Sequence, residues 1–323
     1  MHKFIYSTKD AWINELTSSQ NYGYDEVLEL KKDLNPNTTQ SHAYGVSRIL
    51  TQFDLTEVSN SIVSGEISTN AEYHLRLYST EAHSLPKSYT LVVNPISESW
   101  EEGTGKYADD PITQNGVTWD YRDQSNTNLN WEVSSSDEVS SGSRNIASGS
   151  ETNKSGSKGG GVWYTGSKFD VSQSFSYASP DIDMNVTDIV HKWLSGSTYN
   201  TSTYPNGIEN NGFILRLSGS RDTGLGLEND DVNTFNLKFF SRNTHTIYPP
   251  KLEIKWDDRV GPPSYTSSFM ALDMTGSVDN YVYVKGLRES YKETETVRFR
   301  IGARKRHINK TFSTSVQTVT GSF

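Results

Sequence analysis

Apolar and polar residues alternate with a period of two along most of the chain. In AEYHLRLYS, for example, Tyr73, Leu75 and Leu77 share one face, and the residues between them share the other. This pattern is typical of β-strands that bury one face. Runs of the same kind occur at residues 3–7, 27–30, 43–55, 89–96, 162–172, 212–218, 234–241, 251–257, 280–287, 296–305 and 312–323. The pattern therefore predicts an all-β protein.

One stretch, NVTDIVHKWLSG at residues 185–196, follows a helical period instead. Its apolar residues form a single stripe with a spacing of 3.6 residues: Val186, Ile189, Val190, Trp193 and Leu194. Asn185 is a good N-cap, Asp188 and Lys192 suit the two ends of the helix dipole, and Gly196 is a natural stop. The stretch predicts a short amphipathic helix whose apolar face covers the core, with His191 on the solvated face.

Two segments with few apolar residues divide the chain. Residues 134–160 are rich in Ser and Gly, which predicts a flexible surface loop. Residues 258–264 contain the run GPP and predict a linker. We therefore expect one domain over residues 1–257 and a small β module over residues 265–323. The small module carries too little apolar surface to fold alone, so we expect it to be ordered by contact, either with the first domain or with neighbouring subunits of an assembly.

Composition narrows the classes of function. The 323 residues are 33% hydrophobic and 11% aromatic, which is enough to fill a core, and the net charge of −9 argues against a nucleic-acid partner. The absence of cysteine excludes disulfides, thiolate metal sites and cysteine enzymes. No segment has the ~20 apolar residues that cross a bilayer, and the N-terminus lacks the apolar run of a signal peptide. We expect folding in a cytoplasm and no membrane partner.

Candidate catalytic residues are few. Glu98, Glu101 and Glu102 form a carboxylate cluster, and Asp109 and Asp110 form a pair. A glycosidase needs two carboxylates ~5–9.5 Å apart across a sugar, and the spacing of these residues along the chain does not show such a separation. No H-E-x-x-H or G-x-S-x-G motif occurs. We predict no catalytic residues and interpret the chain as a non-enzyme.

The signals for metals and ligands are weak. The run GLGLENDD at residues 224–231 contains oxygen ligands that suit calcium, but a solvated loop is the simpler interpretation, and we predict no metal and no cofactor. Trp163 and Tyr164 follow the Ser/Gly loop, and we predict that they form an exposed pair that contacts a ligand. The basic run at residues 304–306 suits either an acidic partner or a solvated face.

An ordered series of motifs over residues 3–257 resembles a known domain family. The series is DAWI, NYG, RILTQFDL, AEYHLRLYS, SWEEGTG, VTW, GGG, DIDMNVTDIVHKWLSG, NGFILRLS, FFS and PPKLEIKW. It is similar to the DNRLRE-type domain, which is akin to disaggregatase-related domains and to jelly-roll carbohydrate-binding modules. The resemblance implies a jelly-roll β-sandwich with the short helix packed across one end of the core. It also implies that the stretch around Trp100, Glu101 and Glu102 is a strand end with a buried tryptophan, and that four tryptophans pack in the core: Trp100, Trp119, Trp193 and Trp256. The missing signal peptide and the long Ser/Gly loop depart from the family, whose usual members are secreted.

A second resemblance concerns the C-terminal segment YVYVKGLRESYKETETVRFRIGARKRHINKTF at residues 281–312. It looks like segments of structural proteins from tailed bacteriophages, particularly phages of cyanobacteria. This resemblance implies a non-enzymatic virion structural protein, associated with the tail, neck or a fibre. Its partners would be other virion proteins or copies of itself, bound through residues 265–323. The alternative function is a carbohydrate-binding module that recognises a host-surface polysaccharide.

Overall fold

The chain divides into two compact units, Met1–Asp258 and Arg259–Phe323. The computed structural model describes residues 1–34, 44–125, 128–131, 144–146, 159–165, 168–176, 180–194, 207–219, 226–228, 230, 233–256, 280–285, 287–288 and 290–305. The predicted linker at residues 258–264 and the predicted strand at 312–323 lie outside these residues. Among the helices described, none is long and apolar enough to span a membrane.

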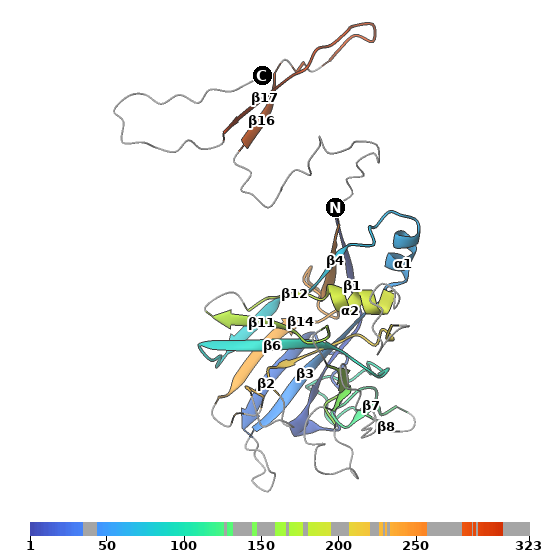
Figure 1. Cartoon of the computed structure of the whole chain (residues 1–323). Helices are drawn as coiled ribbons and strands as arrows, with labels where there is room; N and C mark the ends of the chain where they lie inside the picture. The colour runs from blue at the N-terminus through green and yellow to red at the C-terminus, as the bar shows by residue number, and fades with distance from the viewer. Residues whose placement is uncertain are drawn as a thin grey trace, which may run out of the picture. The chain divides into compact units, whose positions relative to one another are not determined.

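The first unit is built mainly from antiparallel strands (Figure 1). Its main strands are β1 (His2–Asn14), β2 (Val27–Leu34), β3 (Tyr44–Phe53), β4 (Glu72–Leu77), β5 (Ser79–His83), β6 (Ser88–Pro95), β11 (Val171–Ser176), β12 (Ile182–Asn185), β13 (Phe213–Leu217), β14 (Phe235–Phe240) and β15 (Lys251–Lys255). Two minor hairpins are β7 (Tyr121–Asp123) with β8 (Leu129–Asn130), and β9 (Arg144–Ile146) with β10 (Val162–Tyr164). The helical elements are η1 (Glu15–Thr17), α1 (Thr56–Val63) and α2 (Thr187–Leu194).

The strands form two layers, and the long strand β1 takes part in both. Its first half pairs with β15 and its second half with β3, and the register shifts between Ser7 and Lys9. One layer contains the run β11-β6-β13-β3-β1, and the other contains the run β1-β15-β4-β12. Strand β14 pairs with β5 and β2, and β2 pairs in turn with β3. Apolar side chains from both layers meet in one large core cluster. The prediction of an all-β sandwich is confirmed.

The central strands β3 and β13 are buried on both faces, which strict alternation would not indicate. One face of β13 contributes Phe213, Leu215 and Leu217 to the core between the layers. The other face contributes Ile214 to a second cluster, which contains four tryptophans. Residues 96–131 and 159–163 supply most of this second cluster and cover the layer from outside. The sheet is therefore sandwiched between two apolar cores at its centre.

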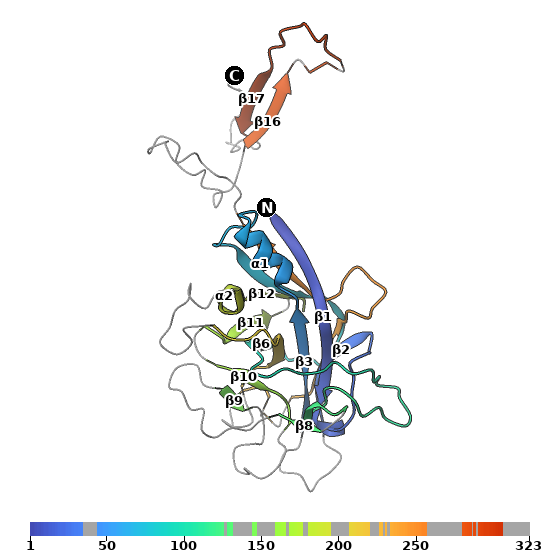
Figure 2. The same cartoon turned by 90° about the vertical axis from the view of Figure 1, so that its right-hand side faces the viewer.

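Helix α2 closes one edge of the space between the layers (Figures 1 and 2). The Thr187 hydroxyl accepts a hydrogen bond from the Tyr73 amide of β4 at 2.8 Å, and the Trp193 ring lies 4.6 Å from the Phe213 ring of β13 in the opposite layer. Val186, Ile189 and Val190 are fully buried in the main core, as expected from the apolar stripe. Trp193 and Leu194 are only partly buried but pack against the same core.

The prediction that His191 is solvated is wrong. The residue is 8% exposed, and its ring meets the Tyr73 ring edge-on at 5.5 Å. Burial lowers the pKa of His191 below its ordinary value, because desolvation penalises the imidazolium. The buried face of α2 is wider than the apolar stripe because the helix sits in a groove between two layers, so side chains at its margins are covered too.

Two further elements differ from the sequence predictions. Helix α1 was not expected, although Leu55, Val58 and Ile62 have helical spacing; Val58 is buried and Ile62 packs against the core. Residues 144–146 lie within the predicted flexible loop, yet they form β9 and pair with β10. The backbone N–H and C=O groups of β10 find hydrogen-bond partners in residues 144–146, so a short strand forms within the predicted loop. The remainder of residues 134–158 lies outside the described residues.

The second unit contains the antiparallel hairpin of β16 (Asn280–Lys285) and β17 (Arg300–Lys305). The register pairs Val284 with Ile301 and Tyr283 with Gly302. A Cβ atom on Gly302 would lie 2.7 Å from the Tyr283 ring, so the glycine makes room for this aromatic side chain. Val284 and Ile301 remain exposed, by 43% and 64%. The described hairpin therefore presents apolar side chains on its surface.

Candidate functional site

The carboxylates singled out in the sequence are engaged with cations and backbone groups. Glu102 Oε1 lies 2.9 Å from Arg242 Nε and accepts a hydrogen bond from the Asp10 amide at 2.9 Å. Glu101 Oε2 lies 3.2 Å from Lys9 Nζ. These contacts tie the segment after Trp100 to β1 and to the loop after β14. They hold that segment in place, which agrees with the structural interpretation of the motif.

Asn21 joins the NYG motif to the EEGTG motif, although the two lie about eighty residues apart in the chain. Its side chain is fully buried. The amide Nδ2 donates to the carbonyl oxygens of Glu102 and Val117 at 2.8 and 2.6 Å. The side-chain oxygen accepts from the amides of Gly23 and Gly105 at 3.1 and 2.7 Å. All the bonding groups of one amide side chain are thus used to clamp two loops together.

Glycines let these two loops pack backbone against backbone. A Cβ atom on Gly23 would lie 1.9 Å from the Glu102 carbonyl oxygen, and one on Gly105 would lie 2.4 Å from the Asn21 carbonyl oxygen. The Tyr24 amide also donates to the Gly105 carbonyl at 2.9 Å. The loops that follow Asn21 and Glu101 therefore form one rigid body, and the side chains that they carry have fixed positions.

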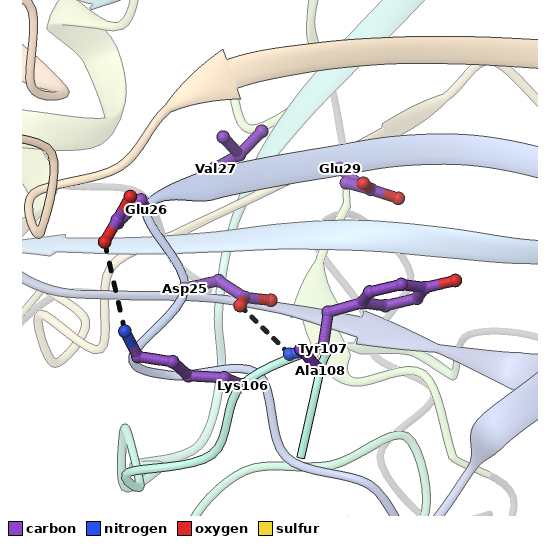
Figure 3. A pocket seen from close by; sticks show the side chains of 7 residues that line it. All are labelled: Asp25, Glu26, Val27, Glu29, Lys106, Tyr107 and Ala108. Atoms are coloured by element: carbon purple, nitrogen blue, oxygen red, sulfur yellow. Dashed lines mark hydrogen bonds and ion pairs between the residues drawn. The ribbon is translucent and has the colours of Figure 1, made fainter.

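This rigid loop pair carries a surface hollow, which we call the tyrosine hollow, with two lobes. The first lobe has a volume of about 300 Å³. It is lined by Asp25, Glu26, Val27, Glu29, Lys106, Tyr107 and Ala108. Figure 3 shows Asp25 and Glu26 meeting Lys106 and Tyr107: Asp25 accepts a hydrogen bond from the Tyr107 amide at 3.0 Å, and Glu26 pairs with Lys106 at 3.9 Å.

The second lobe has a volume of about 310 Å³ and shares Glu26 and Lys106 with the first. Its other lining residues are Tyr24, Arg242, Asn243, Thr244 and His245. The Asn243 side chain donates to the Gly23 carbonyl at 3.3 Å, which fastens the loop after β14 to the loop pair. The Glu26–Lys106 pair therefore belongs to the lining of both lobes.

Each lobe has one exposed tyrosine whose ring is fixed by a cation. Tyr107 is 62% exposed, and Lys31 Nζ lies 5.4 Å from the centre of its ring. Tyr24 is 50% exposed, and Lys106 Nζ lies 5.3 Å from the centre of its ring. Such cation–π contacts favour one orientation of an exposed ring by about 0.5–1 kcal/mol and leave part of the ring uncovered. The two tyrosines therefore offer fixed aromatic surfaces to a ligand.

Asp25 links the lining of the first lobe to the core. Its carboxylate accepts a hydrogen bond from Trp12 Nε1 at 2.9 Å in addition to the bond from the Tyr107 amide. Burial raises the pKa of Asp25, although the two donors oppose the change. The Trp12 ring stacks on the Tyr22 ring at 3.9 Å, so the floor of the lobe continues into the main core.

The prediction of Trp163 and Tyr164 as an exposed pair is wrong. Trp163 is fully buried in the second cluster, and Tyr164 is partly buried. The guanidinium groups of Arg48 and Arg216 lie 5.1 and 4.8 Å from the Trp163 ring. Both arginines are buried, and an isolated buried charge is costly. Nearby groups that interact favourably with a cation, such as this ring, reduce that cost. Tyr24 and Tyr107 were missed, although both stand in turn-forming runs, NYGYD and GKYADD.

Two acidic residues of the run that offered an alternative calcium site, Glu228 and Asp230, form ion pairs. Glu228 Oε1 lies 2.8 Å from Arg48 Nη2, and both side chains are buried. Asp230 Oδ1 lies 3.2 Å from Lys32 Nζ, which is also buried. Within the described part of the chain, no group of three His, Cys, Asp or Glu residues could hold a metal ion. The basic side chains at residues 304–306 lie outside the described residues.

Comparison of the chain with protein-family models finds no matching family, and no curated protein matches it. The resemblance to the DNRLRE-type domain and to phage structural proteins therefore stays a prediction. The geometry of the tyrosine hollow is the main guide to function.

Proposed function

We propose that the sandwich is a non-enzymatic saccharide-binding domain and that the tyrosine hollow is its binding site. The observation that carries this proposal is the pair of exposed tyrosines, Tyr24 and Tyr107, which line a hollow together with charged side chains on backbone-packed loops. A sugar ring has an apolar C–H face that packs on an aromatic ring and a belt of hydroxyls that bonds to polar side chains. Binding sites of this kind combine aromatic surface with a few polar groups that fix orientation.

Loops that are ordered before binding favour a ligand that is flexible and makes only weak contacts. Association costs the freedom of every group that becomes ordered, so a site that is already ordered loses less free energy on binding. Asn21 and the close contacts at Gly23 and Gly105 order the loop pair before any ligand arrives. Tyrosine adds little cost because its side chain has only two rotatable bonds.

Screening of the full chain on a glycan array, followed by calorimetry with the best ligand, tests the proposal. Tyr107→Ala should weaken binding about tenfold or more, as expected for an aromatic residue at the centre of a contact. Tyr6→Ala is the matched control, because Tyr6 is similarly exposed at 54% but lies on β1 and is not among the residues that line the hollow. Absence of binding to every glycan, or equal losses from both variants, would contradict the proposal.

A second function, assembly within a virion as a structural protein, is favoured by the C-terminal hairpin. Five large apolar side chains of the described part of that unit are exposed by 43–65%: Val282, Val284, Leu287, Phe299 and Ile301. Exposed apolar groups on a two-stranded sheet suit pairing with another subunit, since both strand edges can accept a further strand. We propose that copies of the chain or other virion proteins, in a tail, neck or fibre, cover this surface. Both functions are compatible in one protein.

Sedimentation of the full chain over a range of concentrations tests the assembly proposal. If the hairpin pairs with a second copy, Val284→Ser with Ile301→Ser should lower the association constant, because both side chains lie on one face. Lys292→Ser, at an exposed polar position of the same unit, is the control. A chain that is monomeric at all concentrations and binds no virion protein through this unit would contradict it.

A further inference from the structure

We infer that the hairpin of the second unit in one copy of the chain docks on an aromatic patch of the first unit in another copy, so that copies assemble head to tail. This inference rests on the proposed assembly function and specifies the partner and its surface. Two exposed apolar surfaces on one chain, and the opposite charges of the units that carry them, lead to it.

Aromatic side chains gather on the outer face of the layer that contains β1, β15 and β4. Alternate residues of these strands, such as Leu252, enter the core. Phe4, Tyr6 and Lys251 follow the opposite alternation and therefore point away from the core. Lys251 Nζ lies 4.7 Å from the centre of the Phe4 ring and 4.7 Å from the centre of the Tyr78 ring, so one cation links two neighbouring strands of the surface.

The loop after β14 extends this surface. The Tyr248 ring lies 5.2 Å from the Tyr78 ring and 5.7 Å from the Phe240 ring. Tyr248 is 43% exposed, and Ile247 beside it is 77% exposed. We call the following six residues the aromatic patch: Phe4, Tyr6, Tyr78, Phe240, Ile247 and Tyr248. Contiguous exposed groups of this kind mark interaction sites more often than single exposed residues do.

Charged side chains adjoin the patch on the same face. In the register of the layer, Lys251 lies opposite Arg76 of β4, and Arg76 lies opposite Asp183 of β12. Arg76 Nη2 and Asp183 Oδ2 form an ion pair at 3.2 Å. The surface therefore changes from aromatic to charged towards β12. An apolar centre with a polar margin is the usual composition of a protein–protein interface.

The hairpin of β16 and β17 offers a matching apolar surface. The register places Val284 directly opposite Ile301, and Val282 follows the same alternation, so the three side chains share one face. They are exposed by 43%, 64% and 62%, respectively. An isolated two-stranded ribbon is at best marginally stable. Docking of this face on a larger apolar surface would therefore stabilise the hairpin as well as the contact.

The two units carry opposite net charges. Residues 259–323 contain ten Lys or Arg and five Asp or Glu residues, a net charge of +5, whereas the whole chain carries −9. Residues 1–258 therefore carry −14. Opposite charges attract the second unit of one copy to the first unit of another, which speeds association and favours this contact over others.

Charge thus selects one of three possible contacts between copies. Two first units repel each other, and so do two second units, because like charges that face each other across an interface are unfavourable. The contact between a first and a second unit joins different surfaces and is heterologous. Repetition of this contact either closes into a ring, of which a reciprocal dimer is the smallest, or continues as a filament.

Sedimentation velocity of the full chain at low and high salt tests the contribution of charge. Between about 50 and 500 mM salt, the association constant of a contact between opposite charges should fall about tenfold or more, because the attraction is screened. A contact between two hairpins, or between two first units, should strengthen instead, because salt screens their repulsion. An association constant that rises with salt would overturn the inference and leave the assembly function standing.

Two double variants of the full chain test the two surfaces. Val284→Ser with Ile301→Ser removes apolar groups from the hairpin, and Phe4→Ser with Tyr248→Ser removes rings from the patch. Each should weaken self-association about tenfold or more. All four side chains are more than one-third exposed, so the melting temperature of the first unit should stay close to that of the parent chain.

Leu34→Ser with Val63→Ser is the matched control for the patch. These apolar residues of the first unit are exposed by 64% and 86% and lie outside the patch. The control should associate like the parent chain. Equal losses from the control and the patch variant would overturn the inference, because exposed apolar residues would then matter regardless of position.

A mixture of the two double variants gives the sharpest test. The hairpin variant keeps an intact patch, and the patch variant keeps an intact hairpin. An equimolar mixture should therefore form complexes with the affinity of a single parent contact, although neither variant associates well alone. A patch variant that associates like the parent chain, or a mixture that associates no better than its components, would overturn the inference.

The outcomes also separate this inference from the assembly function. Binding of another virion protein through the hairpin by a chain that never self-associates would overturn the inference and keep that function. Absence of both self-association and binding to any virion protein would overturn both.

Discussion

At the scale of single residues, buried polar side chains decide how the loops are arranged. Asn21 clamps two loops through four hydrogen bonds, and Lys32 and Arg48 reach buried partners in the segment that contains Glu228 and Asp230. A buried polar group without a partner costs free energy, so each of these residues requires its neighbours to be in one place. Such residues therefore specify the loops more strictly than apolar contacts alone could.

Asp10 is expected to make stability depend on pH. Its carboxylate is 1% exposed and bonds to the Ser7 hydroxyl and the Arg242 amide, and burial raises its pKa from 3.8 to about 7. Because the folded state holds this proton more tightly than the unfolded state, its contribution is fully present below pH 3.8 and is lost as pH rises through about 7. The loss is on the order of a few kcal/mol.

Asp10→Asn should remove this dependence. Urea unfolding of both proteins between pH 4 and pH 8 measures it: relative to the parent chain, the variant should gain stability from pH 4 to about pH 7, and the difference should then level off. Groups other than Asp10 contribute equally to both proteins and cancel in the difference. A difference that stays constant with pH would show that Asp10 is already ionised at pH 4.

At the scale of elements, α2 and the covered sheet show how context modifies a local pattern. The apolar stripe of α2 marks the face that enters the core, while packing between two layers buries His191 and Lys192 beside it. Strand β13 follows the same principle: FILRL alternates weakly, and all five of its residues are buried because a second cluster covers the outer face. An element's neighbours therefore decide how much of it is buried.

Ile189→Ala tests the role of α2 in the core. The side chain is fully buried, so its truncation should lower the free energy of unfolding by about 2–4 kcal/mol, through lost burial and the cavity left behind. Asp188→Ala is the control on the same helix, because its exposed pair with Lys168 should contribute less than about 1 kcal/mol. Chemical denaturation of both variants gives the comparison, and similar losses would mean that the helix does not cover the core.

At the scale of the whole molecule, the first unit contains all the buried apolar clusters described. Both clusters draw only on residues before 258. A chain that ends at Asp258 should therefore keep the melting temperature and enthalpy of the first unit within a few degrees and a few per cent. Scanning calorimetry of the full and shortened chains measures this. A fall of more than about 5 °C in the shortened chain would show that the second unit stabilises the first.

The sequence by itself determined the fold class, most strands and the position of α2, because period-two and period-3.6 patterns are local properties. Residues 72–77 and 187–194 illustrate this, since each buries the face that its pattern indicates.

The tertiary structure alone decided which aromatic residues reach the surface. Trp163 and Tyr107 follow similar loop-like runs, yet Trp163 is fully buried beside two arginines and Tyr107 is 62% exposed. The difference comes from long-range packing: residues 96–131 fold over one face of the sheet, and Asn21 holds the second loop at the rim. Exposure depends on such distant contacts, which no local pattern of residues records.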